Sequence, residues 1–375
     1  ITTAIVSNAA FIIQDRMTYL QQETGYPEQD IFSITVMTYG KERDLSQQFE
    51  EDEALLRNLP GVVDAALSNA VPLSGSGSAS GMGLKPAPEP GRNVRAGYLF
   101  ADDHMLNTLG VKLKEGRNFA PDEVIVTQDP DKVPNVAIVS STFALEAYPD
   151  GDGLGKLMYM GDKPFKIIGI VDKMKGPWLK DDRPDNVVIF PYIRAETYQH
   201  IIVRTEPGQR ATVMQTVEDK LLAAYDKRVF TNVITLDENK RQYNASDTLM
   251  LRMLMVLIVV LVAITALGIF GLTLFNISKR TRQIGTRRAL GARKSDIIRY
   301  FLVENTLICS GGLIIGCTAA VLMGQQLLQR FSLPALEFQY VAGTAIMVLV
   351  MTLVAVIFPA RRAAQISPSV ATRSI

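Results

Sequence analysis

Side chains that commonly do chemistry are sparse in this sequence, and none of them completes a catalytic motif. The stretch GDGLGK, residues 151–156, resembles a phosphate-binding loop. It lacks the four-residue spacing between glycines that a Walker A motif needs, and Leu157 stands where that motif has Ser or Thr. We therefore expect that this segment does not bind ATP.

Histidine and cysteine are too few for an ordinary zinc site in the polar part of the chain. His104 and His200 are the only histidines, and both cysteines, Cys309 and Cys317, fall in a long apolar run. An ordinary zinc site in the polar part of the chain would need such ligands. No serine occurs in a Gly-x-Ser-x-Gly context, so a hydrolase with a nucleophile elbow has no support. We predict that the chain is not an enzyme and holds no cofactor or metal of its own.

The densest chemical feature is the basic stretch SKRTRQIGTRRALGARKSD, residues 278–296. It holds seven of the 39 Lys and Arg, although the formal net charge of the chain is only +1. Clustered cations can bind a nucleic-acid backbone. No aromatic side chain alternates with these cations, and we expect no nucleic-acid partner. Two interpretations stay open: a signal for membrane topology alone, or a surface for a partner protein.

Long apolar runs on both sides explain where the basic stretch lies. Residues 253–274, 306–328 and 340–360 carry no charge, and each run has the roughly 20 residues that a helix needs to cross a bilayer. We predict membrane helices, in contact with lipid, that are joined by loops. The predicted segments are helices at 248–277, 299–328 and 340–360, loops at 278–298 and 329–339, and a tail at 361–375.

The apolar start of the chain, residues 1–13, is shorter than a membrane span. It lacks the basic stretch before it and the small-residue site after it that mark a signal peptide. We interpret it as the outer part of a first membrane helix whose beginning lies outside this sequence, which gives four spans. The polar region that follows, residues 14–247, is long enough for a substantial core.

Basic residues also predict which side of the membrane each segment faces, because short cytoplasmic loops carry an excess of Lys and Arg. From Lys279 to Arg299, eight cations stand against the single acid Asp296, and the tail begins with Arg361 and Arg362. The polar region instead holds 35 acidic and 26 basic residues. We therefore place the basic loop and the tail in the cytoplasm, and the polar region outside it.

The basic loop has the pattern of a short helix, a turn and a long helix. Residues 281–290 can form a helix that Gly291 ends, and Ser295 offers an N-cap for the helix that enters the membrane. A rigid helix below the bilayer can transmit force from a cytoplasmic partner. The residues that we expect on this coupling surface are Arg280, Arg282, Ile284, Gly285, Arg287, Arg288, Leu290 and Gly291.

The membrane runs offer no polar path for a substrate. Glu304 is the only acid near them and lies close to the cytoplasmic end, where we expect an interfacial or helix-pairing role. A carrier coupled to protons or ions needs ionisable groups near mid-membrane. Gly312 and Gly316 form a small-xxx-small pair, which predicts close helix packing.

The polar region contains two successions of strand, helix and strand, which predict an α+β domain. The first succession covers residues 31–37, 45–59 and 62–71, and the second covers residues 201–204, 211–225 and 229–236. We predict two β-α-β halves with a stalk, at 14–83 and 193–247, around an inserted mixed β subdomain at 84–192. The Ser- and Gly-rich residues 74–83 predict a flexible linker ahead of the insertion.

Several motifs resemble those of a known permease family. NISKRTRQIGTRRALGARKSDIIRYFLVEN, residues 276–305, resembles the signature of FtsX-type permeases, with Gln283 where that family often has Glu. FPARRAAQISPSVA, residues 358–371, resembles the closing segment of the same family. The segments that resemble the MacB-type periplasmic core domain are residues 59–75, 109–123, 148–171 and 183–192.

This resemblance implies a four-span permease of the MacB-like superfamily of ABC transporters. Such permeases form dimers, with a second copy or a paralogue, and work with cytoplasmic ATPases that bind ATP and Mg in a partner chain or a fused domain. Members drive efflux through a periplasmic adaptor and a TolC-like outer-membrane duct, extract lipoproteins, or regulate cell-wall hydrolases without cargo. The large outer domain favours efflux, from a bacterial inner membrane with this domain in the periplasm.

Overall fold

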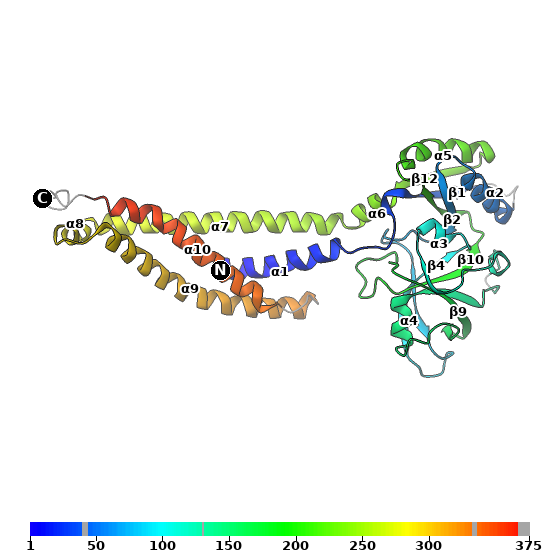
Figure 1. Ribbon diagram of the computed structural model, residues 1–375, viewed down its shortest axis with the longest axis horizontal. Helices are drawn as coiled ribbons and strands as arrows, with labels where there is room; N and C mark the ends of the chain where they lie inside the picture. Colours follow the sequence, from blue (N-terminus) through cyan, green and yellow to red (C-terminus); the bar gives the residue numbers. More distant parts are fainter. Residues whose placement is uncertain (40–43, 130, 332–335, 367–375) are drawn as a thin grey trace. The chain divides into compact units, whose positions relative to one another are not determined.

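The protein divides into two compact units in a computed structural model that describes residues 1–375 except 40–43, 130, 332–335 and 367–375. A helical unit consists of residues 1–22 and 246–375, and a β-rich unit consists of residues 23–245 (Figure 1). Parts of the predicted loop at 329–339 and of the predicted tail at 361–375 lie outside the described residues.

The described residues of the helical unit form five helices. They are α1 (Thr2–Leu20), α7 (Ala245–Lys279), α8 (Thr281–Ala289), α9 (Lys294–Phe331) and α10 (Phe338–Ala363). Within the described chain, α7, α9 and α10 are long and apolar enough to cross a membrane, and the three complete predicted spans lie inside them. Helix α1 does not meet that criterion, so the fourth span stays a prediction.

Helix α1 packs along α9 and α10. The Asn8 side chain is buried, and its Nδ2 donates hydrogen bonds to the carbonyl oxygens of Ala4, at 2.9 Å, and of Ala320 on α9, at 3.0 Å. The ring of Phe11 meets the ring of Tyr340 on α10 edge to face, with centroids 5.3 Å apart. A polar side chain buried among apolar helices is satisfied here by backbone carbonyls.

The β-rich unit is built on one large sheet. The strand order in this sheet is β12-β1-β11-β2-β4-β3-β8-β9-β7-β10-β6, with β5 paired to β9 and a further pairing of β4 with β10. The strands are β1 (Ile31–Thr38), β2 (Val62–Ser68), β3 (Ser78–Gly83), β4 (Asn93–Ala101), β5 (Leu113–Gly116), β6 (Ile125–Thr127), β7 (Val136–Ser140), β8 (Leu157–Met160), β9 (Lys163–Val171), β10 (Val187–Arg194), β11 (Tyr198–Thr205) and β12 (Arg228–Thr235). The helices are α2 (Leu45–Arg57), α3 (Met105–Leu109), α4 (Ser141–Ala147), α5 (Arg210–Ala224) and α6 (Leu236–Tyr243), with short 3-10 helices at Glu28–Asp30 and Pro121–Glu123.

The two strand-helix-strand successions interleave in this sheet. Strand β1 pairs antiparallel with both β11 and β12, and β11 pairs antiparallel with β2. Each succession is therefore a split β-α-β unit with a strand of the other between its own two strands, as in ferredoxin-like folds. Apolar side chains of α2 and α5, spaced for one helix face, join the strands in a common core. The strands thus form one joint sheet and not two separate halves.

The prediction of a flexible linker at residues 74–83 is wrong, because its second half is strand β3. This strand pairs antiparallel with β4 over residues 78–83, and the Met82 side chain is fully buried. A Cβ atom added at Gly77 would lie 2.5 Å from Cγ of Pro177. Glycine in a strand often marks such a close approach of another segment. The small residues here permit tight packing, although their composition is also that of a mobile linker.

Candidate functional site

The basic loop folds as the sequence predicts up to the end of its short helix. Helix α8 ends in a Schellman motif, in which Gly291 has a φ of 96°. The amide of Gly291 donates to the carbonyl of Arg288, at 3.2 Å, and the amide of Ala292 donates to the carbonyl of Arg287, at 3.0 Å. The prediction that Gly291 ends the helix is confirmed.

The next helix begins differently from the prediction. Helix α9 starts at Lys294, so Ser295 lies inside its first turn and is not the N-cap. Instead, the Asp296 carboxylate accepts a hydrogen bond from the amide of Arg293, at 2.8 Å. A carboxylate in the first turn satisfies a free amide and also interacts favourably with the helix dipole, which explains why it takes this role.

An apolar core fixes α8 to the membrane helices. Ile284 and Gly285 are buried, and Ile284 belongs to one buried apolar cluster with Phe301 of α9, which is only 1% exposed. The other buried members of this core are Ile277, Ile297, Val356, Ala360, Ala363 and Ala364. Three membrane helices therefore contribute to the surface on which α8 rests.

A polar contact ties the end of α7 to α9 beside this core. Nη1 of Arg280 donates to both carboxylate oxygens of Glu304, at 2.8 and 2.9 Å, and to the hydroxyl of Tyr300, at 3.0 Å. The guanidinium of Arg287 lies over the Tyr300 ring, 4.7 Å from its centroid. The predicted helix-pairing role of Glu304 is confirmed, and the charged ends of the pair make this a strong type of hydrogen bond.

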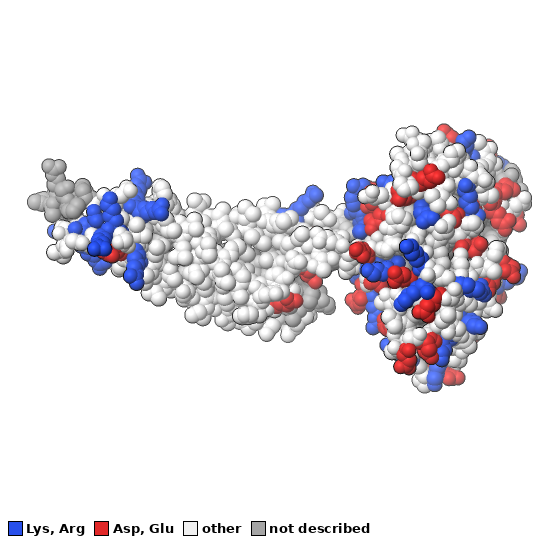
Figure 2. All heavy atoms as spheres, in the orientation of Figure 1, with Lys and Arg blue, Asp and Glu red and all other residues white. Residues whose placement is uncertain are grey.

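The other residues of the predicted coupling surface are turned to solvent. Arg282, Arg287 and Gly291 are exposed, and Leu290 is 84% exposed. Arg288 is half-buried and donates to the carbonyl of Ala292. Figure 2 shows basic side chains gathered around α8, beside a long stretch of helix surface that carries no charge. The eight predicted residues thus divide into an anchoring set and an exposed set, and their contact with an ATPase stays a prediction.

The two predicted packing glycines lie in different surroundings. A Cβ atom added at Gly316 would lie 3.0 Å from Cβ of Thr3 on α1, whereas one added at Gly312 would meet nothing within 4 Å. The close approach continues along α9 at Ala320, which is fully buried, and at Gly324. Residues 316, 320 and 324 repeat every four positions, and this extension of the small-xxx-small pattern is the signal that the sequence analysis missed.

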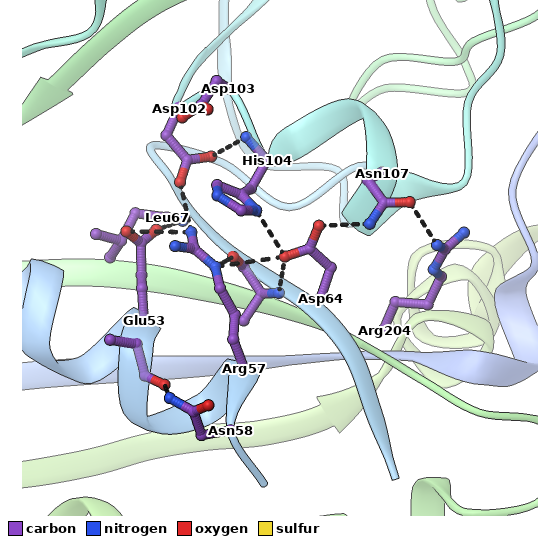
Figure 3. A network of polar contacts seen from close by, with 12 residues as sticks. Glu53, Arg57, Asn58, Asp64, Leu67, Asp102, Asp103, His104, Asn107 and Arg204 are labelled. Carbon is purple, nitrogen blue, oxygen red and sulfur yellow. Dashed lines mark hydrogen bonds and ion pairs between the residues drawn. The ribbon is translucent and has the colours of Figure 1, made fainter. Parts of the chain in front are cut away.

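Sequence analysis also missed a buried polar network centred on Arg57, at the end of α2 (Figure 3). Nη2 of Arg57 donates to Asp102, at 2.8 Å, and lies 3.4 Å from Glu53, while Nε donates to the carbonyl of Ala65 and lies 3.3 Å from Asp64. Three largely buried carboxylates from α2, β2 and the end of β4 therefore share one guanidinium.

A second layer of the Arg57 network reaches β11. Nδ1 of His104 lies 2.9 Å from an oxygen of Asp64, and Nδ2 of Asn107 donates to the other oxygen, at 2.6 Å. Asn107 in turn accepts from Nη2 of Arg204, at 2.8 Å. The network therefore joins α2, β2 and β11 to the segment that leaves β4.

Burial, together with the neighbouring negative charges, shifts the pKa of carboxyl groups in the Arg57 network. Burial, and then the charge of Asp102, raise the pKa of Glu53 well above its ordinary value, and burial also raises the pKa of Asp102. The two groups are hydrogen-bonded to each other. Among the described residues, no group of His, Cys, Asp and Glu could hold a metal ion. The contacts of the Arg57 network link α2, β2, β11 and the segment after β4 within the β-rich unit.

Three long apolar helices and a large β-rich unit define an integral membrane protein with a substantial domain outside the bilayer. Residues 3–220 match the family model of the MacB-like periplasmic core domain, and residues 255–368 match that of the FtsX-like permease C-terminal region. The first match alone covers more than half of the chain. The chain belongs to the MacB-like family of ABC transporter permeases.

Two curated relatives and one solved structure illustrate the similarity. The macrolide export ATP-binding/permease protein MacB of Mannheimia succiniciproducens is 27% identical over 69% of this chain and 40% of its own length. The probable syringafactin export ATP-binding/permease protein SyfD of Pseudomonas syringae pv. syringae is 31% identical over 59% of this chain and 35% of its own length. The periplasmic region of MacB from Actinobacillus actinomycetemcomitans shows 16% identity and a TM-score of 0.37, over 60% of this chain and 97% of the other. The chain thus spans about two fifths of the length of the curated relatives.

Proposed function

We propose that this chain is the permease part of an ABC-type export machine, in which ATP hydrolysis in the cytoplasm moves a periplasmic domain. An ATPase, in a partner chain or in an attached domain, binds ATP and Mg and presses on the basic loop. The machine is a dimer in the inner membrane and passes its substrate to a periplasmic adaptor and an outer-membrane duct. The named activities of the relatives, export of macrolides and of syringafactin, favour export of a small molecule.

The observation that carries this proposal is the anchoring of α8. The helix rests on the core around Phe301, and Arg280 links the end of α7 to Glu304 of α9. We expect displacement of α8 to move α7 and α9, because only Arg280 separates α7 from α8 and only residues 290–293 separate α8 from α9. Helix α7 is continuous over 35 residues, from Ala245 to Lys279. At 1.5 Å per residue it spans roughly 50 Å and can carry the displacement along its axis.

The composition of the spans supports movement without a conduit. In α7 no charged residue occurs between Met253 and Ser278, and in α10 none occurs between Phe338 and Ala360. In α9 the single acid inside the span region, Glu304, is paired with Arg280. Ionisable groups that would serve ion-coupled transport near mid-membrane are missing from these described helices. The energy for export is therefore expected to enter through the basic loop.

Charge reversal on α8 tests the proposal. In the complete complex, the double variant Arg287→Glu and Arg288→Glu should lower substrate-stimulated ATPase activity and export by at least tenfold. Leu290→Asp should have a similar effect without disturbing the core, because the Leu290 side chain is 84% exposed. Arg252→Glu changes an exposed cation near the other end of α7 and serves as the matched control.

Retained export and retained ATPase stimulation in both α8 variants would remove the basic loop from the mechanism. The cargo is tested separately, by analysis of what copurifies with the complex in mild detergent. A bound lipoprotein would replace small-molecule export by lipoprotein extraction on the same scaffold. Normal export in a deletion strain, together with a cell-wall phenotype, would instead indicate regulation without cargo.

A further inference from the structure

The β-rich unit contains a cavity of about 280 Å³ whose walls are mainly aromatic. Tyr98 and Phe100 are two positions apart on β4, and Phe190 and Tyr192 are two positions apart on β10. The two strands are parallel, and their register places Phe100 beside Phe190. The four rings therefore share one face of the sheet. Phe165 of β9 completes the wall, with its centroid 4.6 Å from that of Phe190. Phe100 and Tyr192 lie 5.0 Å apart in an edge-to-face arrangement.

Tyr192 in this wall is largely buried as a residue, but its hydroxyl is not one of the fully buried polar atoms that lack a partner. Its side chain is only 5% exposed, and none of the hydrogen bonds found among the described residues involves its hydroxyl. A tyrosine side chain combines an apolar ring with a polar end that takes a hydrogen-bond partner. The hydroxyl of Tyr192 is therefore available to a molecule that enters the cavity.

Two basic residues, Lys163 and Arg194, line the cavity. Lys163, at the start of β9, lines the cavity and is half-buried, and no ion pair of the described residues involves it. Arg194 also lines the cavity, but its guanidinium pairs with Glu196, at 3.2 Å. No acidic side chain is among the described lining residues. A lysine beside an apolar, acid-free cavity favours a ligand that combines an apolar body with a negative charge.

We propose that this cavity binds a small amphipathic anion, with an aromatic body among the rings and its carboxylate facing Lys163. The Tyr192 hydroxyl donates a hydrogen bond to an oxygen of the same ligand. The volume is slightly below the usual range for small-molecule pockets, about 300–1,000 Å³, which suits a body of two rings. Apolar walls with a few placed polar groups are the usual composition of such a site. The site is independent of the basic loop and of the proposed export function.

Photolabelling of the full-length chain in mild detergent tests this proposal. The probe is 4-benzoylbenzoate, and labelled peptides are identified by mass spectrometry. Labelling is expected in the peptides that contain residues 160–165 and 190–194. The carboxylate 2-naphthoate should prevent labelling at a concentration about tenfold lower than its neutral analogue 2-naphthamide, a factor that corresponds to about 1.4 kcal/mol.

Two conservative variants assign the polar groups. Lys163→Gln should raise the protecting concentration of 2-naphthoate about tenfold and abolish the preference over 2-naphthamide. Tyr192→Phe keeps the ring and should raise the protecting concentration of 2-naphthoate about threefold to tenfold. Lys166→Gln, on the same strand but outside the cavity lining, should leave it unchanged.

Three results would overturn the site. They are labelling outside these peptides, equal protection of the wild-type chain by the acid and the amide, and wild-type behaviour of both the Lys163 and the Tyr192 variants. Because the comparison of acid and amide uses the wild-type chain, a variant that fails to fold does not decide the outcome.

Discussion

Replacing Glu53 by Gln should make the β-rich unit more stable at neutral pH, although it removes a buried acid from the Arg57 network. The pKa of Glu53 is raised well above its ordinary value, first by burial and then by the charge of Asp102. The folded chain therefore holds the proton on this group to a higher pH than the unfolded chain does. Glutamine imitates the protonated acid, since its amide can donate to Asp102 while its oxygen accepts from the amide of Leu67, as Oε1 of Glu53 does at 2.8 Å.

The magnitude of the effect follows from the proton balance. A carboxyl whose folded pKa is raised contributes full stability below its unfolded pKa of about 4.3, and this contribution falls as pH rises toward the folded pKa. The Glu53→Gln variant has no titrating group here and does not lose this stability as pH rises. Its free energy of unfolding should therefore exceed that of the wild type by an amount that grows by up to ~1.4 kcal/mol per pH unit. We expect the variant and the wild type to be roughly equally stable near pH 4.5, and the variant to be more stable by roughly 1–2 kcal/mol at pH 6.

Removing the cation should have the opposite effect. Arg57→Met leaves the buried carboxyls of Glu53, Asp64 and Asp102 without their shared guanidinium. Loss of one partner from a buried ion pair costs about 3–5 kcal/mol, because a buried charge remains uncompensated. Such a loss is a large fraction of the stability of a typical domain.

Urea unfolding of the full-length chain in detergent measures both effects. Trp178 is the only tryptophan and lies in the β-rich unit, so its fluorescence reports on that unit. Glu50→Gln, an exposed acid on the same helix, is the matched control and should change the free energy of unfolding by less than about 0.5 kcal/mol. The reasoning would be refuted if Glu53→Gln were less stable than wild type at pH 7, or if its advantage shrank as pH rose from 4.5 to 6.

Two glycines of the helical unit give further predictions. Gly291→Val places a β-branched residue at a φ of 96° and should destabilise the end of α8 by about 1–2 kcal/mol, seen as faster cleavage of the loop by trypsin, whereas Gly291→Asn should largely restore protection. Gly316→Leu inserts a side chain where Cβ alone would lie 3.0 Å from Thr3 and should lower the thermal stability in detergent by about 1–3 kcal/mol, whereas Gly312→Leu, with nothing within 4 Å, should not. Equal effects of the two leucine variants would show that α1 does not depend on that contact.

Elements with a regular pattern could be predicted from the sequence. The strand at 31–37, the helix at 45–59 and the helix at 211–225 correspond closely to β1, α2 and α5, because alternation and helical spacing are local properties. The pairing of these elements could not be predicted in the same way. The interleaved order β12-β1-β11-β2 depends on contacts between strands that are more than 100 residues apart in the chain.

The two candidate sites also differ in whether their residues are close together in the sequence. The basic loop is continuous in sequence, so its charge, its short helix and its terminating Gly291 could be recognised together. The Arg57 network draws Arg57, Asp64, Asp102 and Arg204 from separate elements, and no spacing between these residues marks them as neighbours. For Ser74 to Gly83 the composition pointed to the wrong state, because small residues favour both mobile linkers and closely packed strands.

We proposed that the cations of the basic loop form a docking surface in addition to setting the membrane topology. The structure of the loop supports this proposal. A topology signal needs only charge, and a disordered loop would provide it. Here Arg280 is oriented by Glu304 and Tyr300, and Arg287 by the ring of Tyr300. Ordering long side chains and a helix costs conformational entropy that insertion into the membrane does not require. An ordered cationic surface, with Leu290 exposed beside it, is the arrangement that a docking partner needs in order to push on α7 and α9 together.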